Sequence, residues 1–163
     1  MNRQEILDEI NQTKLHLAYL EEKLRECEYG GWKPSAYEDY WFLSTTLLPV
    51  ATINKSGLDR DRLDTYNCFK TKEEAEAEAE KILVRRQLED IARLLNKGEE
   101  LNWSEYFSPK YYLSYNMARK MIELHNEGQE KHQGTVYCLD ESFKDVAIQE
   151  IGEERLKKYL GGE

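Results

Sequence analysis

The chain has 163 residues, of which 40% are hydrophobic and 34% are charged. That length fits one domain with at most a short appendage, and no run reaches the ~20 apolar residues that span a bilayer. The net charge of −9 argues against direct nucleic-acid binding, because phosphate contacts need Lys and Arg patches. The N-terminus is charged and unlike a secretory signal, so we expect a cytoplasmic protein that does not contact a membrane.

Residues 2–28 predict one uninterrupted amphipathic helix with a heptad repeat. Its a and d positions are Ile6, Ile10, Thr13, Leu17, Leu20, Leu24 and Cys27. A parallel pair would align the g and e′ positions Glu9 with Lys14′, His16 with Glu21′ and Lys23 with Glu28′. These pairs are attractive, the second one when its histidine is protonated, so the pattern favours a parallel homodimer. The alternative is that this helix packs on the body of its own chain.

The next part of the chain predicts two strands and a long helix. Residues 40–44 and 48–53 are rich in aromatic and β-branched side chains, which favour strands. A turn and a polar loop follow, up to Thr65. Thr71 and Glu74 form the T-x-x-E capping box of a helix that runs to Asn96. Its apolar residues lie on two opposite faces, so either the helix bends or different partners cover its two sides.

The last part of the chain repeats this order. Residues 110–115 and 135–139 predict two further strands. The segment between them, 117–133, has an apolar spacing that looks helical. A final helix begins at Ser142, with Asp145 as its second capping residue, and Gly152 would either cost this helix about 1 kcal/mol or mark a break in it.

These elements predict an α+β fold. An N-terminal coiled-coil helix (1–30) precedes an α+β domain (31–163), in which helices pack on a small antiparallel sheet. The domain divides into two degenerate strand–strand–helix halves, 31–98 and 99–163.

The cysteines and histidines do not have metal-ligand spacing. There are three of each, at Cys27, Cys68, Cys138, His16, His125 and His132. We predict neither a metal nor another cofactor, and we expect the thiols to be reduced, with Cys68 and Cys138 in the core. The last two histidines are expected on the surface.

Together with P-K-Y-Y at 109–112, three other motifs resemble a family of small proteins from phages and prophages of Gram-positive bacteria. They are W-K-P at 32–34, N-C-F-K-T-K-E-E-A-E at 67–76 and A-I-Q-E-I-G-E-E-R-L-K-K-Y at 147–159. Many members of that family begin with a short coiled coil. The resemblance implies an accessory role in the cytoplasm of an infected host cell, and a strand hairpin where 117–133 looks helical.

Two kinds of surface are candidates for binding a partner. Strand alternation would turn Trp41 and Tyr112 outward if the opposite face of each strand is core. The alternative is a sheet that helices cover on both faces, with every aromatic side chain buried. The start of the long helix is densely acidic and could dock on a basic protein surface. The predicted partner-binding residues are Glu73, Glu74, Glu76, Glu78, Glu80, Trp41 and Tyr112.

The sequence contains no phosphate-binding, nucleophile or zinc-hydrolase motif. We therefore predict a non-catalytic binding protein, in its sharpest form an inhibitor of a host defence system, similar to an anti-CRISPR protein. One alternative is a phage regulatory or assembly factor that binds protein or single-stranded nucleic acid. The other is a metal-dependent enzyme that uses the Asp59–Asp64 loop.

Overall fold

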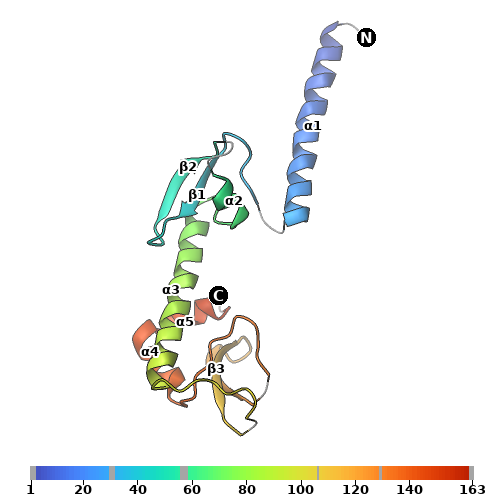
Figure 1. Ribbon diagram of the computed structural model, residues 1–163. Helices are drawn as coiled ribbons and strands as arrows, with labels where there is room; N and C mark the ends of the chain where they lie inside the picture. The colour runs from blue at the N-terminus through green and yellow to red at the C-terminus, as the bar shows by residue number, and fades with distance from the viewer. Residues whose placement is uncertain (1–2, 30–31, 56–58, 106, 129, 162–163) are drawn as a thin grey trace. The chain divides into compact units, whose positions relative to one another are not determined.

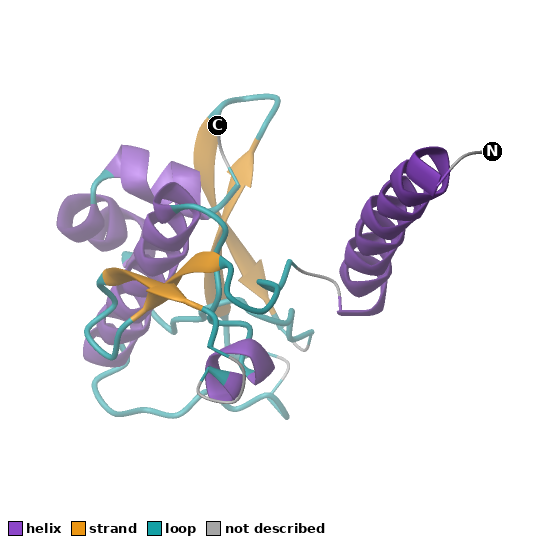
Figure 2. Cartoon of the chain, turned by 90° about the horizontal axis from the view of Figure 1, so that it is seen from above, coloured by secondary structure: helices purple, strands orange, loops and turns teal. Residues whose placement is uncertain are grey.

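The computed structural model describes residues 3–29, 32–55, 59–105, 107–128 and 130–161. The chain divides into two compact units, Met1–Ala79 and Glu80–Glu163, and the boundary lies inside the long helix α3 (Lys72–Leu95). Helices alternate along the chain with two antiparallel hairpins, which belong to two separate sheets (Figures 1 and 2). The prediction of an α+β fold is therefore confirmed. The prediction of one small sheet is wrong, because the hairpins form two separate two-stranded sheets.

The first unit contains one hairpin and two helices ahead of α3. These are α1 (Arg3–Tyr29), β1 (Asp39–Leu43), β2 (Pro49–Ile53) and α2 (Arg60–Asp64). A later segment lies beside β1, where Phe69 forms an isolated antiparallel bridge with Trp41. Asn67 fixes this segment, because its side-chain amide accepts from the Leu43 N–H and donates to the Leu43 carbonyl, both at 2.8 Å.

The second unit has a hairpin followed by two helices. These are β3 (Lys110–Asn116), β4 (Met121–Glu127), α4 (Phe143–Ile151) and α5 (Glu153–Tyr159). An isolated antiparallel bridge joins Tyr111 of β3 to Cys138. Gly152 separates the two helices, with a φ of 93° that favours glycine, so of the two alternatives for this position the structure shows the break.

The larger hydrophobic core lies in the second unit. One face of the β3–β4 hairpin, the C-terminal part of α3 and the last two helices contribute side chains to it. The buried residues are Val84, Leu88, Ile91, Ala92, Leu113, Ile122, Cys138, Phe143, Ala147, Ile151 and Leu156. Cys68 in the first unit is also buried, and burial raises the pKa of both thiols. The expected core positions of Cys68 and Cys138 are thus confirmed, and the Cys27 side chain lies outside the described residues.

The N-terminal part of α3 belongs to the first unit and the rest of the helix to the second. Ala75 and Ala79 are buried in the first unit, whereas Val84 and Leu88 are part of the core of the second. Leu83, which shares a face with Ala75 and Ala79, belongs to the second unit and is 42% exposed, so coverage of the two sides of the helix by different partners stays a prediction.

The predicted capping box at the start of α3 is present. Thr71 Oγ1 accepts from the Glu74 N–H, and Glu74 Oε2 accepts from the Thr71 N–H, each at 3.2 Å.

Thr71→Ala should therefore lower the free energy of unfolding of the first unit by about 1 kcal/mol. Urea unfolding followed by circular dichroism measures this loss. Thr65→Ala is the comparison, because Thr65 Oγ1 donates to the Asp61 carbonyl at the end of a helix instead of capping a helix start. Equal stability of the Thr71 variant and the wild type would contradict the capping role.

Three local predictions are wrong. Residues 58–65 are not all loop, because α2 forms there, with an Asp59–Arg62 ion pair across one helical turn. The segment 117–133 is not helical: it supplies β4, whose Ile122 packs in the core and whose backbone pairs with β3. The strand expected at 135–139 reduces to the bridge at Cys138, since the Leu139 N–H is bound by Asn96 Oδ1 at 2.8 Å.

The start of α4 is capped differently from the prediction. Ser142 occupies the N-cap position but makes no side-chain capping bond. Asp140 Oδ1 instead accepts from the Ser142 N–H at 2.8 Å. Hydrogen bonds from Ser142, first its side chain and then its backbone, lower the pKa of Asp140. The charged carboxylate is therefore the form that the folded chain favours.

This carboxylate should make unfolding of the second unit depend on pH in acid. A folded-state pKa below the unfolded value gives stability that is complete above the unfolded value and lost as pH falls through the folded one. Asp140→Asn keeps an acceptor oxygen but cannot titrate. Its melting temperature should therefore fall less steeply than that of the wild type below about pH 5 in thermal melts. Parallel curves for the two proteins would rule out this contribution.

Candidate functional site

The β3–β4 hairpin has one face in the core and one polar, aromatic face. Residues directly opposite in an antiparallel register share a face. Leu113 and Ile122 are on the core face. The other face, called the outer face below, is formed by the pairs Lys110–Glu127, Tyr112–His125, Ser114–Glu123 and Asn116–Met121. Strand alternation had predicted that Tyr112 lies opposite the core.

Rings pack around Tyr112 on the outer face. Its ring centroid lies 5.2 Å from that of His125, 5.6 Å from that of His132 and 5.5 Å from that of Tyr137. Trp103 meets Tyr137 edge to face at 4.9 Å. Burial, together with the negative charge of Glu127, raises the pKa of Tyr112. Tyr112 is thus a half-buried member of a ring cluster rather than a fully exposed anchor.

Lys110 is a buried cation at one end of the outer face. Its side chain is 0% exposed. The Nζ atom donates to the carbonyls of Glu105 at 3.1 Å, Ser108 at 2.7 Å and Gly128 at 3.1 Å. It also lies 5.3 Å from the centroid of the Trp103 ring. These contacts attach the loops on both sides of the hairpin to a single charged group.

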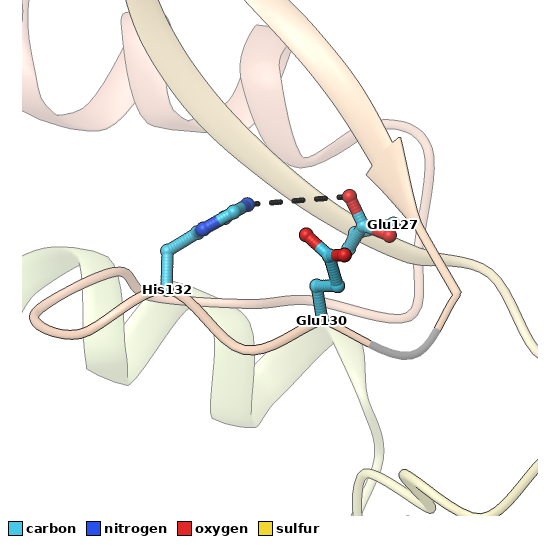
Figure 3. Close-up of side chains that lie close together, drawn as sticks. All are labelled: Glu127, Glu130 and His132. Atoms are coloured by element: carbon cyan, nitrogen blue, oxygen red, sulfur yellow. Dashed lines mark ion pairs between the residues drawn. The ribbon is translucent and has the colours of Figure 1, made fainter.

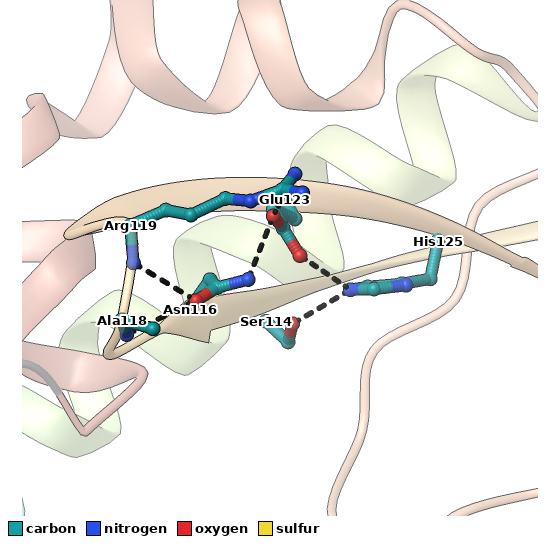
Figure 4. Close-up of polar contacts among 6 residues, drawn as sticks. All are labelled: Ser114, Asn116, Ala118, Arg119, Glu123 and His125. Atoms are coloured by element: carbon teal, nitrogen blue, oxygen red, sulfur yellow. Dashed lines mark hydrogen bonds and ion pairs between the residues drawn. The ribbon is translucent and has the colours of Figure 1, made fainter.

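A second polar group on the outer face resembles catalytic machinery in composition but not in geometry (Figure 4). Ser114 Oγ lies 2.8 Å from His125 Nε2, and Glu123 Oε2 lies 3.7 Å from the same nitrogen. In a serine hydrolase triad the serine and the acid contact different ring nitrogens, so that the acid orients the base. Glu123 Oε1 is also bound by the Asn116 side chain at 2.9 Å. The arrangement therefore gives a hydrogen-bonded surface rather than an activated serine.

Glu127, Glu130 and His132 bring three possible metal ligands together (Figure 3). One ligand atom from each lies within 4.8 Å of the others, and His132 Nε2 is 4.0 Å from Glu127 Oε2. No other triplet of this kind occurs among the residues whose positions are described. No Cys–His spacing marks this group in the sequence, but the local pattern E-x-x-E-x-H was readable there.

The Asp59–Asp64 segment does not form a comparable cluster. Asp59 is buried, with Oδ1 2.6 Å from Arg62 Nη1 and Oδ2 accepting from the Lys55 N–H at 3.1 Å. Arg62 also donates to Tyr40 Oη at 3.3 Å and lies over the Phe42 ring. Asp59 therefore organises the interior of the first unit, and its two oxygens are already bonded.

The acidic residues predicted at the start of α3 do not form one surface. Helical periodicity places Glu73 and Glu76 on one side and Glu74 and Glu78 on another. Glu74 serves the capping box, and Glu76 pairs with Lys72 at 2.8 Å. Glu80 belongs to the second unit, where it pairs with Arg155 at 2.6 Å. The negative charge that α3 can present to a partner is therefore smaller than the presence of five glutamates suggests.

Trp41 is half-buried in β1, and the neighbouring residues explain why. Tyr40 is 1% and Leu43 is 7% exposed, although the strand turns them to opposite faces. Both faces of β1 are thus partly covered, which agrees with the alternative of a sheet covered on both faces and not with one open face. Trp41 also pairs with Phe69 through its backbone.

The apolar positions of α1 are exposed wherever their side chains are described. Ile6, Ile10, Leu17 and Leu20 expose 42%, 43%, 55% and 49% of their surfaces. Thr13 is exposed as well, and its Oγ1 donates to the Glu9 carbonyl within the helix. The side chains of Leu24 and Cys27, the last two heptad positions, lie outside the described residues.

Within the described ranges, no helix combines the length and the apolar character needed to cross a membrane. Comparison of the chain with family models, with curated proteins and with solved structures finds no match.

Proposed function

We propose that this chain is a non-catalytic binding protein that acts as a parallel homodimer joined through α1. The observation that carries the proposal is the exposure of the heptad side chains. The four described isoleucine and leucine side chains at a and d positions are exposed by 42–55%. Burying these side chains against a second copy would remove apolar area from water, which stabilises association.

The charges that flank the heptad support a parallel orientation. Glu9 at a g position would face Lys14 of the second copy at the following e′ position. Both side chains are exposed in α1, where a partner helix can reach them. An antiparallel pair would instead set g against g′ and e against e′, which places a mixture of opposite and like charges together.

A pair of substitutions in the full chain tests the dimer. Ile10→Asp with Leu17→Asp should halve the mass measured by sedimentation equilibrium, because charges cannot be buried in the seam. Leu15→Asp is the matched control: this leucine lies at the outer f position, is 74% exposed and should leave the mass unchanged. A monomeric wild type, or a dimer that survives the double substitution, would refute the proposal.

A charge swap tests the orientation. Lys14→Glu alone should weaken a parallel dimer, since the e′ position then repels Glu9. Adding Glu9→Lys should restore the dissociation constant, because the pair is attractive again. Failure of the second change to rescue the first would point to an antiparallel or otherwise different interface.

We further propose that the dimer binds a protein with a basic surface, as an inhibitor of host defence in an infected cell. The net charge of −9 and the exposed Glu73 and Glu76 support an encounter steered by opposite charge. The aromatic outer face is less suited to single-stranded nucleic acid, because it also carries Glu123 and Glu127, which would repel phosphates.

Charge reversal tests this surface. The tagged full chain should capture a basic protein from a bacterial host lysate, and the captured protein identified by mass spectrometry then serves for binding assays. Glu73→Lys with Glu76→Lys should weaken that binding and reduce its salt dependence. The matched control is Glu150→Lys, which reverses a charge at an exposed position on α4 and should leave the affinity unchanged. Unchanged affinity of the double variant would reject α3 as the binding surface.

The fold also supports the proposal that the two halves of the body are divergent copies. In each unit a hairpin is followed by a segment that makes one antiparallel bridge to the first strand, Phe69 to Trp41 and Cys138 to Tyr111. A helix begins soon after each bridge, at Lys72 and at Phe143.

A further inference from the structure

We propose that Glu127, Glu130 and His132 form a binding site for a divalent transition-metal ion, with Zn²⁺ as the best-suited ion. These residues supply two carboxylates and one imidazole. An imidazole nitrogen beside carboxylate oxygens suits Zn²⁺ and its neighbours in the transition series, whereas Mg²⁺ and Ca²⁺ prefer oxygen ligands alone. The proposal concerns the second unit and does not depend on dimerisation through α1.

The distances are close to those of a loaded site. The three ligand atoms lie within 4.8 Å of one another. Bonds of about 2.0–2.2 Å to one ion would bring them to roughly 3–3.5 Å apart. The required movement is about an ångström, and the side chains of Glu130 and His132 are exposed, so rotation about their side-chain bonds can supply it. Glu127 Oε1 is bound by the Gly128 N–H at 3.1 Å, and Oε2 is the oxygen that faces His132.

The backbone that carries the ligands is fixed at several points. Tyr137 Oη accepts from the His132 N–H at 2.8 Å and contacts the Glu130 carbonyl at 3.5 Å. Lys110 Nζ binds the Gly128 carbonyl, and Glu127 is itself paired with Lys110 in the hairpin register. Ligands on a supported backbone lose less freedom when an ion binds, which favours affinity.

Charge also favours a cation at this point. With a neutral imidazole, the two carboxylates carry a charge of −2 within a few ångströms, and a divalent ion would neutralise it. Three protein ligands leave at least one coordination position for water or for a group from a partner. A bound ion would join the end of β4 to the segment that follows it, beside the Tyr112 ring.

Calorimetric titration of the full chain with ZnCl₂, in a non-coordinating buffer with a phosphine reductant, tests the site. One ion per chain should bind at this site, and the melting temperature should rise with the concentration of free Zn²⁺. Glu130→Gln and His132→Gln should each raise the dissociation constant at least ~tenfold. Their circular dichroism spectra should match the wild type, because both side chains are exposed.

Matched controls separate this site from adventitious binding. His16→Gln on α1 and Glu141→Gln ahead of α4 remove the same chemical groups elsewhere and should leave the dissociation constant unchanged. Co²⁺ provides a second measurement, since its visible absorption bands should appear with the wild type and be lost with His132→Gln. Zn²⁺ affinity that is unaltered by both site variants, or Mg²⁺ binding as tight as Zn²⁺ binding, would overturn the proposal.

Discussion

Tyr137→Ala is expected to lower the free energy of unfolding of the second unit by about 3–5 kcal/mol. Tyr137 is 4% exposed, and its ring contacts Trp103 and Tyr112 with centroid distances of 4.9 and 5.5 Å. Alanine would leave a cavity among these rings and remove a hydroxyl that binds the segment after β4. Urea unfolding followed by tryptophan fluorescence measures the loss, since Trp103 reports on this region directly.

Two further variants divide this effect into its parts. Tyr137→Phe keeps the ring but leaves the His132 N–H without its partner, so a cost of about 1–2 kcal/mol is expected. Tyr19→Ala removes the same side chain from a position on α1 that is 57% exposed and should change stability by less than about 0.5 kcal/mol. If the alanine variant at 137 were no less stable than the phenylalanine variant, the packing argument would fail.

Local signals in the sequence predicted elements whose stabilising contacts are also local. The T-x-x-E pattern at Thr71 indicated the start of α3 because its two hydrogen bonds join residues three positions apart. The break at Gly152 was equally readable, since one residue with positive φ separates two helices. Strand alternation likewise predicted which face of β3 carries Tyr112.

The segment 117–133 shows where local reasoning fails. Met117, Met121 and Leu124 recur at spacings of four and three, which suits a helix, while Ile122 and Leu124 recur at a spacing of two, which suits a strand. The strand form is stabilised by pairing with β3 and by the burial of Ile122 in the core. Both depend on residues outside the segment itself, so its own pattern could not decide between helix and strand.

The candidate site was predictable only in part, for the same reason. The E-x-x-E-x-H pattern of Glu127, Glu130 and His132 is visible in the sequence, but its convergence depends on a bond to Tyr137. The position of His125 beside Tyr112 requires the hairpin register. The acidic residues of α3 are the opposite case: helical periodicity alone places Glu73 and Glu74 on different sides of the helix, so their separation was predictable from the sequence.

Lys110→Met is expected to destabilise the second unit by about 2–4 kcal/mol, although methionine is more hydrophobic and nearly matches the lysine in length. Lysine is rarely buried completely, and the burial of Lys110 is compensated by three carbonyl acceptors. Methionine would leave the carbonyls of Glu105, Ser108 and Gly128 without their donor. Methionine carries no charge, so the variant avoids the free-energy cost of desolvating the Lys110 ammonium group. This gain offsets part of the loss, which is why the expected loss is not larger.

The position of the three acceptors gives this substitution a second, more specific readout. The three carbonyls lie in the loops before β3 and after β4. Amide hydrogen exchange should therefore become faster in both loops of the Lys110→Met protein, while the ranking of amide protection within the core strands stays as in the wild type. Lys158→Met, at an exposed position on α5, should alter neither stability nor exchange. A Lys110→Met protein as stable as the wild type would mean that water replaces the ammonium group at all three carbonyls. Faster exchange in only one loop would instead mean that the other is held by contacts that do not involve Lys110.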